Sequence, residues 1–141
     1  METPLTPLEF MRRSRRLYAQ REAVVDDDLR LTYGQFFARC DRWSSVLQQM
    51  GVRKGDRVAY IAPNTHAQLE SFYAVPQIGA VLVPINYRLS ADDFAYIIGH
   101  SGARASFTAT GKAWWTETSA SRTSSSSIGA TAGRPRSRGW G

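Results

Sequence analysis

Four short segments of this 141-residue chain carry the same signal for the start of a helix. In each segment, a Ser or Thr is followed three residues later by an acid or an amide. The hydroxyl oxygen can accept a hydrogen bond from a free amide of the first helical turn, and the later side chain can reach back to the amide of the first residue. The pattern predicts helices that begin after Thr6, Thr32, Thr65 and Ser90.

Short runs with strand character lie between these helices. Several are bounded by Gly, Asp or Pro, and each is too short for a typical helix. They are Ala23–Val25, Arg57–Ala62, Ala80–Val83 and Ala103–Phe107. The alternation of helix and strand predicts an α/β fold with a largely parallel sheet and flanking helices. Residues 81–83 are apolar at consecutive positions, which predicts a strand covered on both faces.

Apolar residues recur at steps of three and four in the predicted helices, and each such stripe predicts a buried face. The stripes are Phe36, Cys40, Trp43, Leu47 and Met50; then Leu69, Phe72, Tyr73 and Ile78; then Phe94, Ile97 and Ile98. Gly51 is placed to end the second helix, and Pro76 to kink or end the third. We expect His100, Ser101 and Gly102 to close the fourth helix.

The formal charge of +6 is unevenly distributed along the chain. Residues 1–107 hold 13 Lys and Arg against 11 Asp and Glu, whereas residues 108–141 hold 5 against 1. Within the first part, basic residues cluster only at Arg12, Arg13, Arg15 and Arg16. This cluster is interpreted as a solvated helix face, with a patch for an anionic partner as the alternative. Nucleic acid is not favoured as a partner.

Several classes of protein and site are not favoured by the sequence. No stretch approaches the roughly 18 apolar residues of a membrane span, and the N-terminus lacks the layout of a secretory signal, so we expect a cytoplasmic protein. The single Cys40 cannot form an internal disulfide, and there is no Cys/His cluster to hold a metal. Its place in an apolar stripe predicts a core residue rather than a reactive thiol.

Two histidines and one aspartate could suggest catalysis. Neither His66 nor His100 has a suitably spaced Ser, Cys or carboxylate partner in the sequence, so we interpret them as a helix-start and a helix-end residue. Asp56 follows Gly55 before a strand, which indicates turn chemistry rather than a catalytic role.

Five segments follow one another in a recognisable order. They are Leu31–Tyr33, Gly51–Ala59, Ala62–Asn64, Gly79–Leu89 and His100–Ala103. Their succession, over about residues 4–107, resembles the N-terminal subdomain of the AMP-binding (adenylate-forming) superfamily, which includes fatty-acid and aryl-acid CoA ligases, luciferases and the adenylation domains of peptide synthetases. The Asn-Tyr-Arg-Leu turn at residues 86–89 looks more like the acyl-CoA ligase branch than the others.

The resemblance implies an incomplete N-terminal subdomain and, for the full-length enzymes, a two-step reaction. A carboxylic acid attacks ATP to give an acyl-adenylate and pyrophosphate, and CoA then displaces AMP. In the family, ATP and Mg²⁺ are held by a loop ending in Gly-x-Pro-Lys-Gly, by later acidic motifs and by a Lys of a C-terminal domain, which together stabilise phosphate charge. Residues 1–107 contain none of these, so we expect no catalytic residue, metal ligand or cofactor in this chain.

One contact carries over from the family to a residue of this chain. The Arg of the Asn-x-Arg-Leu turn, here Arg88, lies in a region that in acyl-CoA ligases can approach the phosphates of CoA. A guanidinium fork suits a phosphate group. The alternative is a solvated turn residue.

The character of the sequence changes after Phe107. Of the 34 residues from 108 to 141, 13 are Ser or Thr and five are Gly, so this irregular tail is expected to be disordered or out-of-frame sequence. Residues 130–137 superficially resemble the family's phosphate loop. However, Arg136 and Ser137 replace the Lys and Gly of that loop, and no helical pattern follows, so we interpret the likeness as coincidence.

The leading functional hypothesis is therefore an N-terminal fragment of an acid:CoA ligase that is inactive alone. One alternative is a module whose basic tail binds nucleic acid or another polyanion. Another is a fragment that self-associates, or docks onto a full-length ligase, through an exposed sheet edge.

Overall fold

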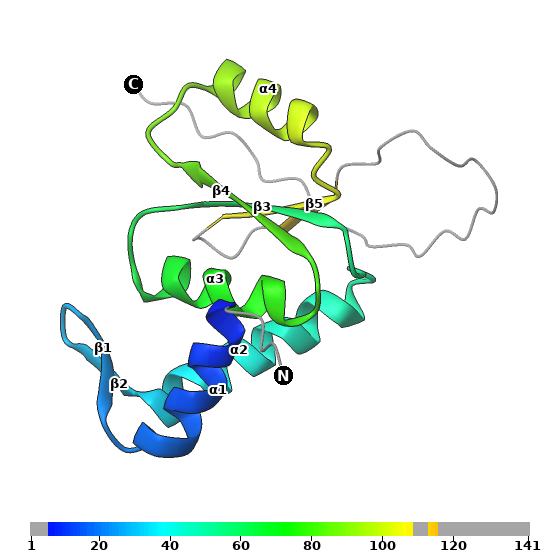
Figure 1. The fold of residues 1–141 in the computed structure, drawn as a ribbon. Helices are drawn as coiled ribbons and strands as arrows, with labels where there is room; N and C mark the ends of the chain where they lie inside the picture. Colours follow the sequence, from blue (N-terminus) through cyan, green and yellow to red (C-terminus); the bar gives the residue numbers. More distant parts are fainter. Residues whose placement is uncertain (1–5, 109–112, 116–141) are drawn as a thin grey trace, which may run out of the picture.

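The computed structural model describes residues 6–108 and 113–115 (Figure 1). Its helices are α1 (Pro7–Tyr18), α2 (Tyr33–Gln49), α3 (His66–Gln77) and α4 (Ala91–Ser101). Its strands are β1 (Glu22–Asp26), β2 (Leu29–Thr32), β3 (Arg57–Ala62), β4 (Val81–Asn86), β5 (Ala105–Thr108) and β6 (Ala113–Trp115). The α/β class expected from the sequence is confirmed.

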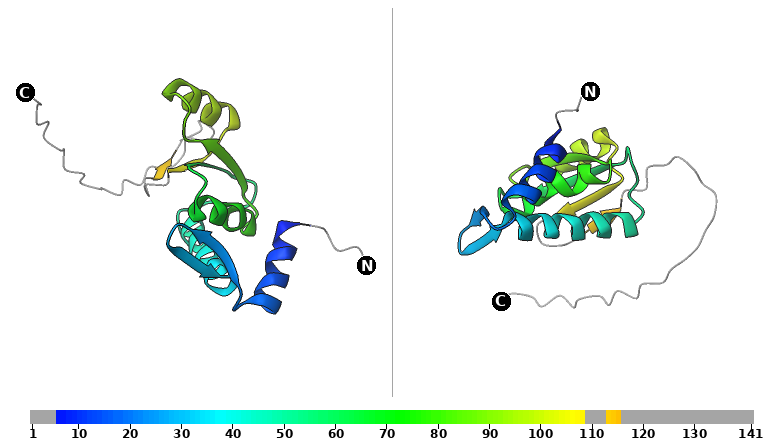
Figure 2. Two further views of the ribbon diagram at one scale, coloured as in Figure 1. Left: turned by 90° about the vertical axis from the view of Figure 1, so that its left-hand side faces the viewer. Right: turned by 60° about the horizontal axis from the view of Figure 1, so that its bottom comes forward.

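The main sheet has the order β4-β3-β5-β6, and β1 and β2 form a separate antiparallel hairpin. Strand β3 pairs in parallel with β4 and with β5, and β6 is antiparallel to β5. The crossovers through α3 and α4 run in opposite directions across the sheet, so right-handed connections place these helices on opposite faces. Figures 1 and 2 show this layering, with α1 and α2 on the same side as α3.

All four helices begin where the sequence predicts. Thr32 Oγ1 accepts from the amide of Gln35 at 3.3 Å, and Gln35 Oε1 accepts from the amide of Thr32 at 2.9 Å. Ser90 and Asp93 form the same reciprocal pair at the start of α4. The N-cap residues of α1 and α3 make no side-chain capping bond. Two of the four predicted signals therefore give the correct start of the helix although the predicted hydrogen bond does not form.

Helix α2 packs its apolar stripe into the core, as the sequence predicts. Phe36, Cys40 and Leu47 are buried, and Trp43 and Met50 are partly buried against them. At the next position, Gly51 takes a φ of 85°, a left-handed conformation that glycine adopts without strain and that ends the helix. Cys40 is 0% exposed, and its assignment to the core is confirmed.

Helix α3 buries a different face from the one predicted. Leu69 and Phe72 are 39% and 45% exposed, so their prediction as buried residues is wrong. Tyr73 and Ile78 are partly buried against the core, as expected. The residues that α3 buries are Gln68, Glu70, Ser71, Ala74 and Val75.

The buried face of α3 follows from its contacts with α2. Ser44 Oγ of α2 donates to the carbonyl oxygen of Ala74 at 2.8 Å, and Arg39 of α2 forms an ion pair with buried Glu70. Ala74 is 0% exposed, and its small side chain lets the two helices approach closely enough for these contacts. The spacing of apolar residues within α3 does not predict this face, because the face is set by polar contacts with residues about 30 positions away in the sequence.

The sheet departs from expectation in two further ways. Strand β4 lies at the edge of the sheet and Val81 is 51% exposed, so the prediction that residues 81–83 are covered on both faces is wrong. The sequence pattern also does not predict β2, because its last residue, Thr32, is at the same time the N-cap of α2. Strand β6 lies within the segment assigned to the tail, and the boundary at residue 107 stays a prediction.

Replacing Leu47 by Ala tests the packing of α2. Leu47 is 0% exposed, so we expect L47A to lower the free energy of unfolding by about 2 to 5 kcal/mol through lost burial and a residual cavity. The neighbouring Val46 is 47% exposed, and V46A should change it by less than about 0.5 kcal/mol. Urea unfolding followed by circular dichroism measures both values, and equal losses would contradict the packing described.

Candidate functional site

The carboxyl ends of β3 and β4 lie side by side, because Ala62 at the end of β3 pairs with Asn86 at the end of β4. The chain turns immediately after each strand, through residues 63–65 in one case and residues 87–90 in the other. In open α/β sheets, ligands bind beyond the carboxyl ends of the strands. We therefore expect a ligand-binding residue at this carboxyl end of the sheet.

Arg88 lies at this carboxyl end, and hydrogen bonds from Arg88 to Asn86 and Tyr87 fix its position. The Asn86 side-chain oxygen accepts from the backbone amide of Arg88 at 3.0 Å, which closes a local turn. The Nε of Arg88 donates to the Tyr87 hydroxyl oxygen at 3.0 Å, and the guanidinium carbon lies 5.4 Å from the centre of the Tyr87 ring. A tyrosine thus positions the arginine through one nitrogen.

The two terminal nitrogens of Arg88 form no hydrogen bond or ion pair with any residue in the described part of the chain. The residue is exposed. A guanidinium held at Nε and free at its other edge can make two parallel hydrogen bonds to one phosphate or carboxylate. The role predicted for Arg88 is not tested by these contacts, but the geometry permits it.

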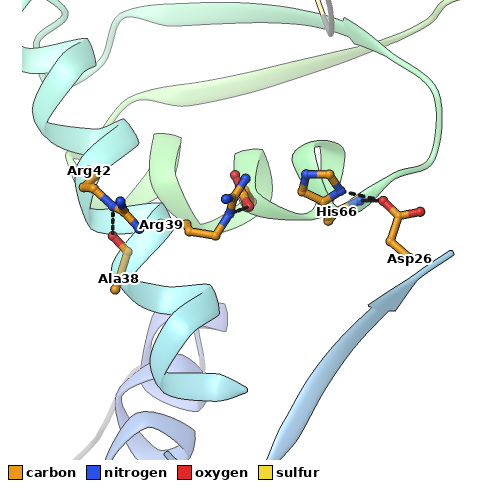
Figure 3. Close-up of polar contacts among 6 residues, drawn as sticks. Asp26, Ala38, Arg39, Arg42 and His66 are labelled. Carbon is orange, nitrogen blue, oxygen red and sulfur yellow. Dashed lines mark hydrogen bonds and ion pairs between the residues drawn. The ribbon is translucent and has the colours of Figure 1, made fainter. Parts of the chain in front are cut away.

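His66 has a carboxylate partner that the sequence did not reveal. It is the first residue of α3, as expected, and its Nδ1 lies 2.6 Å from Asp26 Oδ2 at the end of β1 (Figure 3). The same oxygen accepts from the backbone amide of His66 at 2.8 Å. The inference that His66 lacks a carboxylate partner is therefore wrong, because the partner lies 40 positions away in the sequence.

Asp26 acts as a cap that reaches α3 from another element. The N-cap residue of this helix, Thr65, makes no side-chain capping bond, and Asp26 satisfies the amide of His66 instead. This backbone hydrogen bond, followed by the one from the imidazole, holds the pKa of Asp26 below its ordinary value. The carboxylate therefore ties the β1–β2 hairpin to the start of α3 (Figure 3).

A hollow of about 330 Å³ lies beside this contact, between β1 and α3. Most of the surface area that lines the hollow is apolar, and the lining residues include the Asp26–His66 pair. The lining residues are Val24, Val25, Asp26, Asn64, Thr65, His66, Gln68, Leu69 and Phe72. The sequence placed Leu69 and Phe72 in the core, and the structure brings them together here at the surface instead.

The other residues singled out in the sequence have structural explanations. Asp56 Oδ2 accepts from the amide of Arg53 at 2.8 Å, which confirms its place in a turn. The ring of His100 stacks on that of Tyr96 near the end of α4. Burial raises the pKa of the Cys40 thiol to about 12, which makes it a poor nucleophile.

The arginines of α1 divide into two kinds. Arg12 forms an ion pair within the helix, and Arg15 forms one with Asp41 of α2 at 2.9 Å. Arg13 and Arg16 are exposed and make no such contact with the residues described. Two of the four arginines are therefore paired with carboxylates of this chain.

The described residues provide neither a cluster of metal ligands nor a helix that could span a membrane. Within residues 6–108 and 113–115, His, Cys, Asp and Glu side chains nowhere gather in a group of three that could hold a metal ion. Over the same residues, no helix combines the length and the apolar character that crossing a bilayer requires.

Comparison with known proteins decides the family. Residues 11–137 match the sequence profile described as AMP-binding enzyme. The chain belongs to the AMP-binding enzyme family. The resemblance carried by the five sequence segments is thereby confirmed.

The relatives of this AMP-binding chain are much longer than the chain itself. It is 42% identical over 100 residues to 4-hydroxybutyrate–CoA ligase 2 of Metallosphaera sedula, covering 71% of this chain and 18% of the ligase. It is 42% identical over 104 residues to the peroxisomal trans-cinnamate:CoA ligase of Petunia hybrida, and this match covers 74% of this chain and 18% of that ligase. The chain thus spans less than a fifth of the curated relatives it matches.

The fold agrees with these sequence matches. An inhibitor-bound N-terminal domain of FACL13 from Mycobacterium tuberculosis superimposes with a TM-score of 0.68 at 35% identity. The superposition covers 71% of this chain and 26% of that domain. The predicted assignment to an N-terminal subdomain of an adenylate-forming enzyme is confirmed.

Removing the carboxylate of Asp26 tests the tie between the hairpin and α3. We expect D26A to lower the urea midpoint at pH 7, because the α3 amide and the imidazole lose their acceptor. Exposed Asp28 forms no side-chain hydrogen bond or ion pair with the residues that the structure describes, so D28A is the matched control and should leave the midpoint unchanged.

The effect of D26A should also depend on pH. Because the folded-state pKa of Asp26 is lowered, its contribution is complete above the unfolded-state value, about 4, and is lost as the pH falls through the folded value. The difference between wild type and D26A should therefore narrow below about pH 4. A difference that is constant from pH 7 to pH 3 would contradict the assigned cause.

Proposed function

We propose that residues 6–108 form the N-terminal segment of an acid:CoA ligase, and that the 141-residue chain does not form acyl-adenylate by itself. The observation that carries the proposal is the match at 42% identity, over about 100 residues, to two enzymes named as CoA ligases. The full-length reaction would activate a carboxylic acid with ATP and pass the acyl group to CoA.

The residues of this chain do not fit ATP and Mg²⁺. Phosphoryl chemistry needs backbone amides, a cation and metal-holding carboxylates around the phosphates. Among the described residues, no three His, Cys, Asp or Glu side chains gather where they could hold a metal ion, and the sequence contains no Gly-x-Pro-Lys-Gly. Residues 130–137, which superficially resemble that loop, lie outside the described residues. We therefore assign no step of adenylate formation to this chain.

Arg88 does fit a phosphate of CoA. Its terminal nitrogens are free of partners in the part of the chain that the structure describes, and Tyr87 holds its Nε. The group lies beyond the carboxyl end of a parallel strand, where ligands of α/β proteins bind. In this proposal CoA supplies the thiol of the second step, and Arg88 only binds and orients its nucleotide.

The remaining hypotheses from the sequence stay predictions. Apart from Thr108 and β6, the basic tail needed for polyanion binding lies outside the described residues. The main sheet has β4 at one edge and β6 at the other, and Pro84 of β4 has no amide to donate to another strand, so self-association through the β4 edge would lack one hydrogen bond. The cytoplasmic location is likewise a prediction.

Pyrophosphate exchange tests the proposed lack of activity. We expect the purified 141-residue chain to give no ATP–pyrophosphate exchange above a no-enzyme blank with 4-hydroxybutyrate or trans-cinnamate, the acids named for its relatives. The full-length Metallosphaera sedula ligase serves as the positive control. Exchange that rises in proportion to the concentration of the 141-residue chain would refute the proposal.

Arg88 can be tested in a chimera in which residues 1–108 of this chain replace the matching segment of the Metallosphaera sedula ligase. We expect R88A to raise the KM for CoA about tenfold or more, since a charged hydrogen-bonded contact contributes roughly 1.5 to 3 kcal/mol. Pyrophosphate exchange should be unchanged, because that step does not involve CoA.

The control for Arg88 is R53A. Arg53 is also an exposed arginine, but it precedes β3 and so lies at the opposite end of the sheet. An unchanged KM for CoA in R88A, or an equal rise in R53A, would remove the role assigned to Arg88. The variant Y87F should raise the same constant by a smaller factor, because it frees Nε without removing the charge.

A further inference from the structure

The outward face of helix α1 exposes two large apolar side chains. Phe10 is 60% exposed and Leu17 is 52% exposed. They are seven positions apart, which is about two turns, and Arg13 lies between them on the same side of the helix. Most of the surface area of this face is apolar, and its residues line one surface hollow; they are Glu9, Phe10, Arg12, Arg13, Arg16 and Leu17.

The opposite face of α1 is fixed to the rest of the fold. Met11 is buried in a core cluster that includes residues of α2, and Leu8 packs partly buried against this cluster. Arg15 forms an ion pair with Asp41 of α2 at 2.9 Å, and its guanidinium lies over the ring of Phe37. Because these contacts hold α1 from one side, its outward face lies at the periphery of the fold (Figure 2).

The charge on the outward face is positive. Arg13 and Arg16 are exposed and form no hydrogen bond or ion pair with residues 6–108 or 113–115. Arg12 pairs with Glu9 of the same helix, and both side chains are exposed. Three arginines against one glutamate give this face a net charge of +2, which attracts an anionic surface.

A lipid bilayer suits this mixture of groups better than a protein groove or nucleic acid does. A helix that docks in a protein groove presents apolar side chains at positions i, i+3, i+4 and i+7. Counted from Phe10, positions i+3 and i+4 are Arg13 and Ser14 instead. Nucleic acid would bind the arginines through its phosphates but would leave Leu17 without a partner. At a bilayer surface, apolar side chains enter the acyl boundary while arginines extend to the headgroups.

We propose that the outward face of α1 docks this protein onto the surface of an anionic lipid bilayer. Phe10 and Leu17 enter the boundary between headgroups and acyl chains, and Arg13 and Arg16 bind lipid phosphate groups. The contact is peripheral and reversible, since it uses one helix face and two apolar side chains. The inference does not rest on the proposed function, because it uses no residue assigned to CoA.

Co-sedimentation of the 141-residue chain with lipid vesicles tests the docking. Vesicles of phosphatidylcholine and phosphatidylserine in a two-to-one ratio supply the anionic surface, and vesicles of phosphatidylcholine alone supply a neutral one. We expect a partition coefficient at least about tenfold higher for the anionic vesicles, since each arginine at such a surface strengthens binding about fivefold. Equal binding to both kinds of vesicle would contradict the proposal.

Charge variants locate the contact, because the five Lys and Arg of residues 108–141 also attract anionic lipid. We expect R13Q and R16Q each to lower the partition coefficient about fivefold, and R13K to keep it. The matched control is R53Q, which changes an exposed arginine outside α1. It should have less than about a twofold effect, because a charge away from the contact acts only through screened attraction. Equal losses in R13Q and R53Q would mean attraction by net charge alone and would overturn the proposal.

Apolar variants distinguish a bilayer from other anionic partners. F10A should lower the partition coefficient about threefold or more, because binding strength scales with the apolar area that enters the bilayer. F72A is the matched control, since Phe72 is 45% exposed on α3, and it should bind as wild type does. If F10A also binds as wild type does while R13Q binds weakly, the face binds a polyanion such as nucleic acid, and the proposal is wrong.

The variants should fold as wild type does, because Phe10, Arg13 and Arg16 are exposed. Urea unfolding checks this, and the comparison of R13K with R13Q separates charge from folding at one position. The vesicle assay contains neither ATP nor CoA. Its failure would therefore leave the proposed function untouched, and an inactive chimera would leave the docking proposal untouched.

Discussion

Strand β3 holds the sheet together, because it is paired on both sides and buried on both faces. Its Val58 and Tyr60 belong to the core shared with α2 and α3, whereas Ala59 packs toward α4. Pairing with β4 and β5 in opposite directions across the sheet forces the two crossover helices onto opposite faces. The same pairing sets the ends of β3 and β4 level, and this brings the turn that carries Arg88 to the same end of the sheet as the turn that follows β3.

Local signals predicted local structure well. The starts of all four helices could be read because a Ser or Thr and the residue three positions later lie within one turn. The face that α3 buries could not, since it depends on contacts with α2 about 30 positions away. The exposed position of β4 depends on strand order, which no single segment encodes.

The candidate site shows the same division. Arg88 was identified from a four-residue motif. The residue that positions it, Tyr87, belongs to the same motif and could have been predicted from it. The Asp26–His66 contact has no comparable signal, because nothing in the sequence joins residues 40 positions apart before the hairpin and α3 are in place. The family could be recognised because its evidence was an ordered series of short motifs, each readable without tertiary structure.

The central claim is that this chain corresponds to the first part of an acid:CoA ligase and depends on the rest of such an enzyme for its chemistry. The most direct measurement is mass-spectrometric detection of 4-hydroxybutyryl-CoA formed by the chimera from the acid, ATP and CoA. The account predicts product from the chimera and none from the 141-residue chain. A cooperatively folded chimera that forms no product, under conditions where the intact Metallosphaera sedula ligase is active, would contradict it.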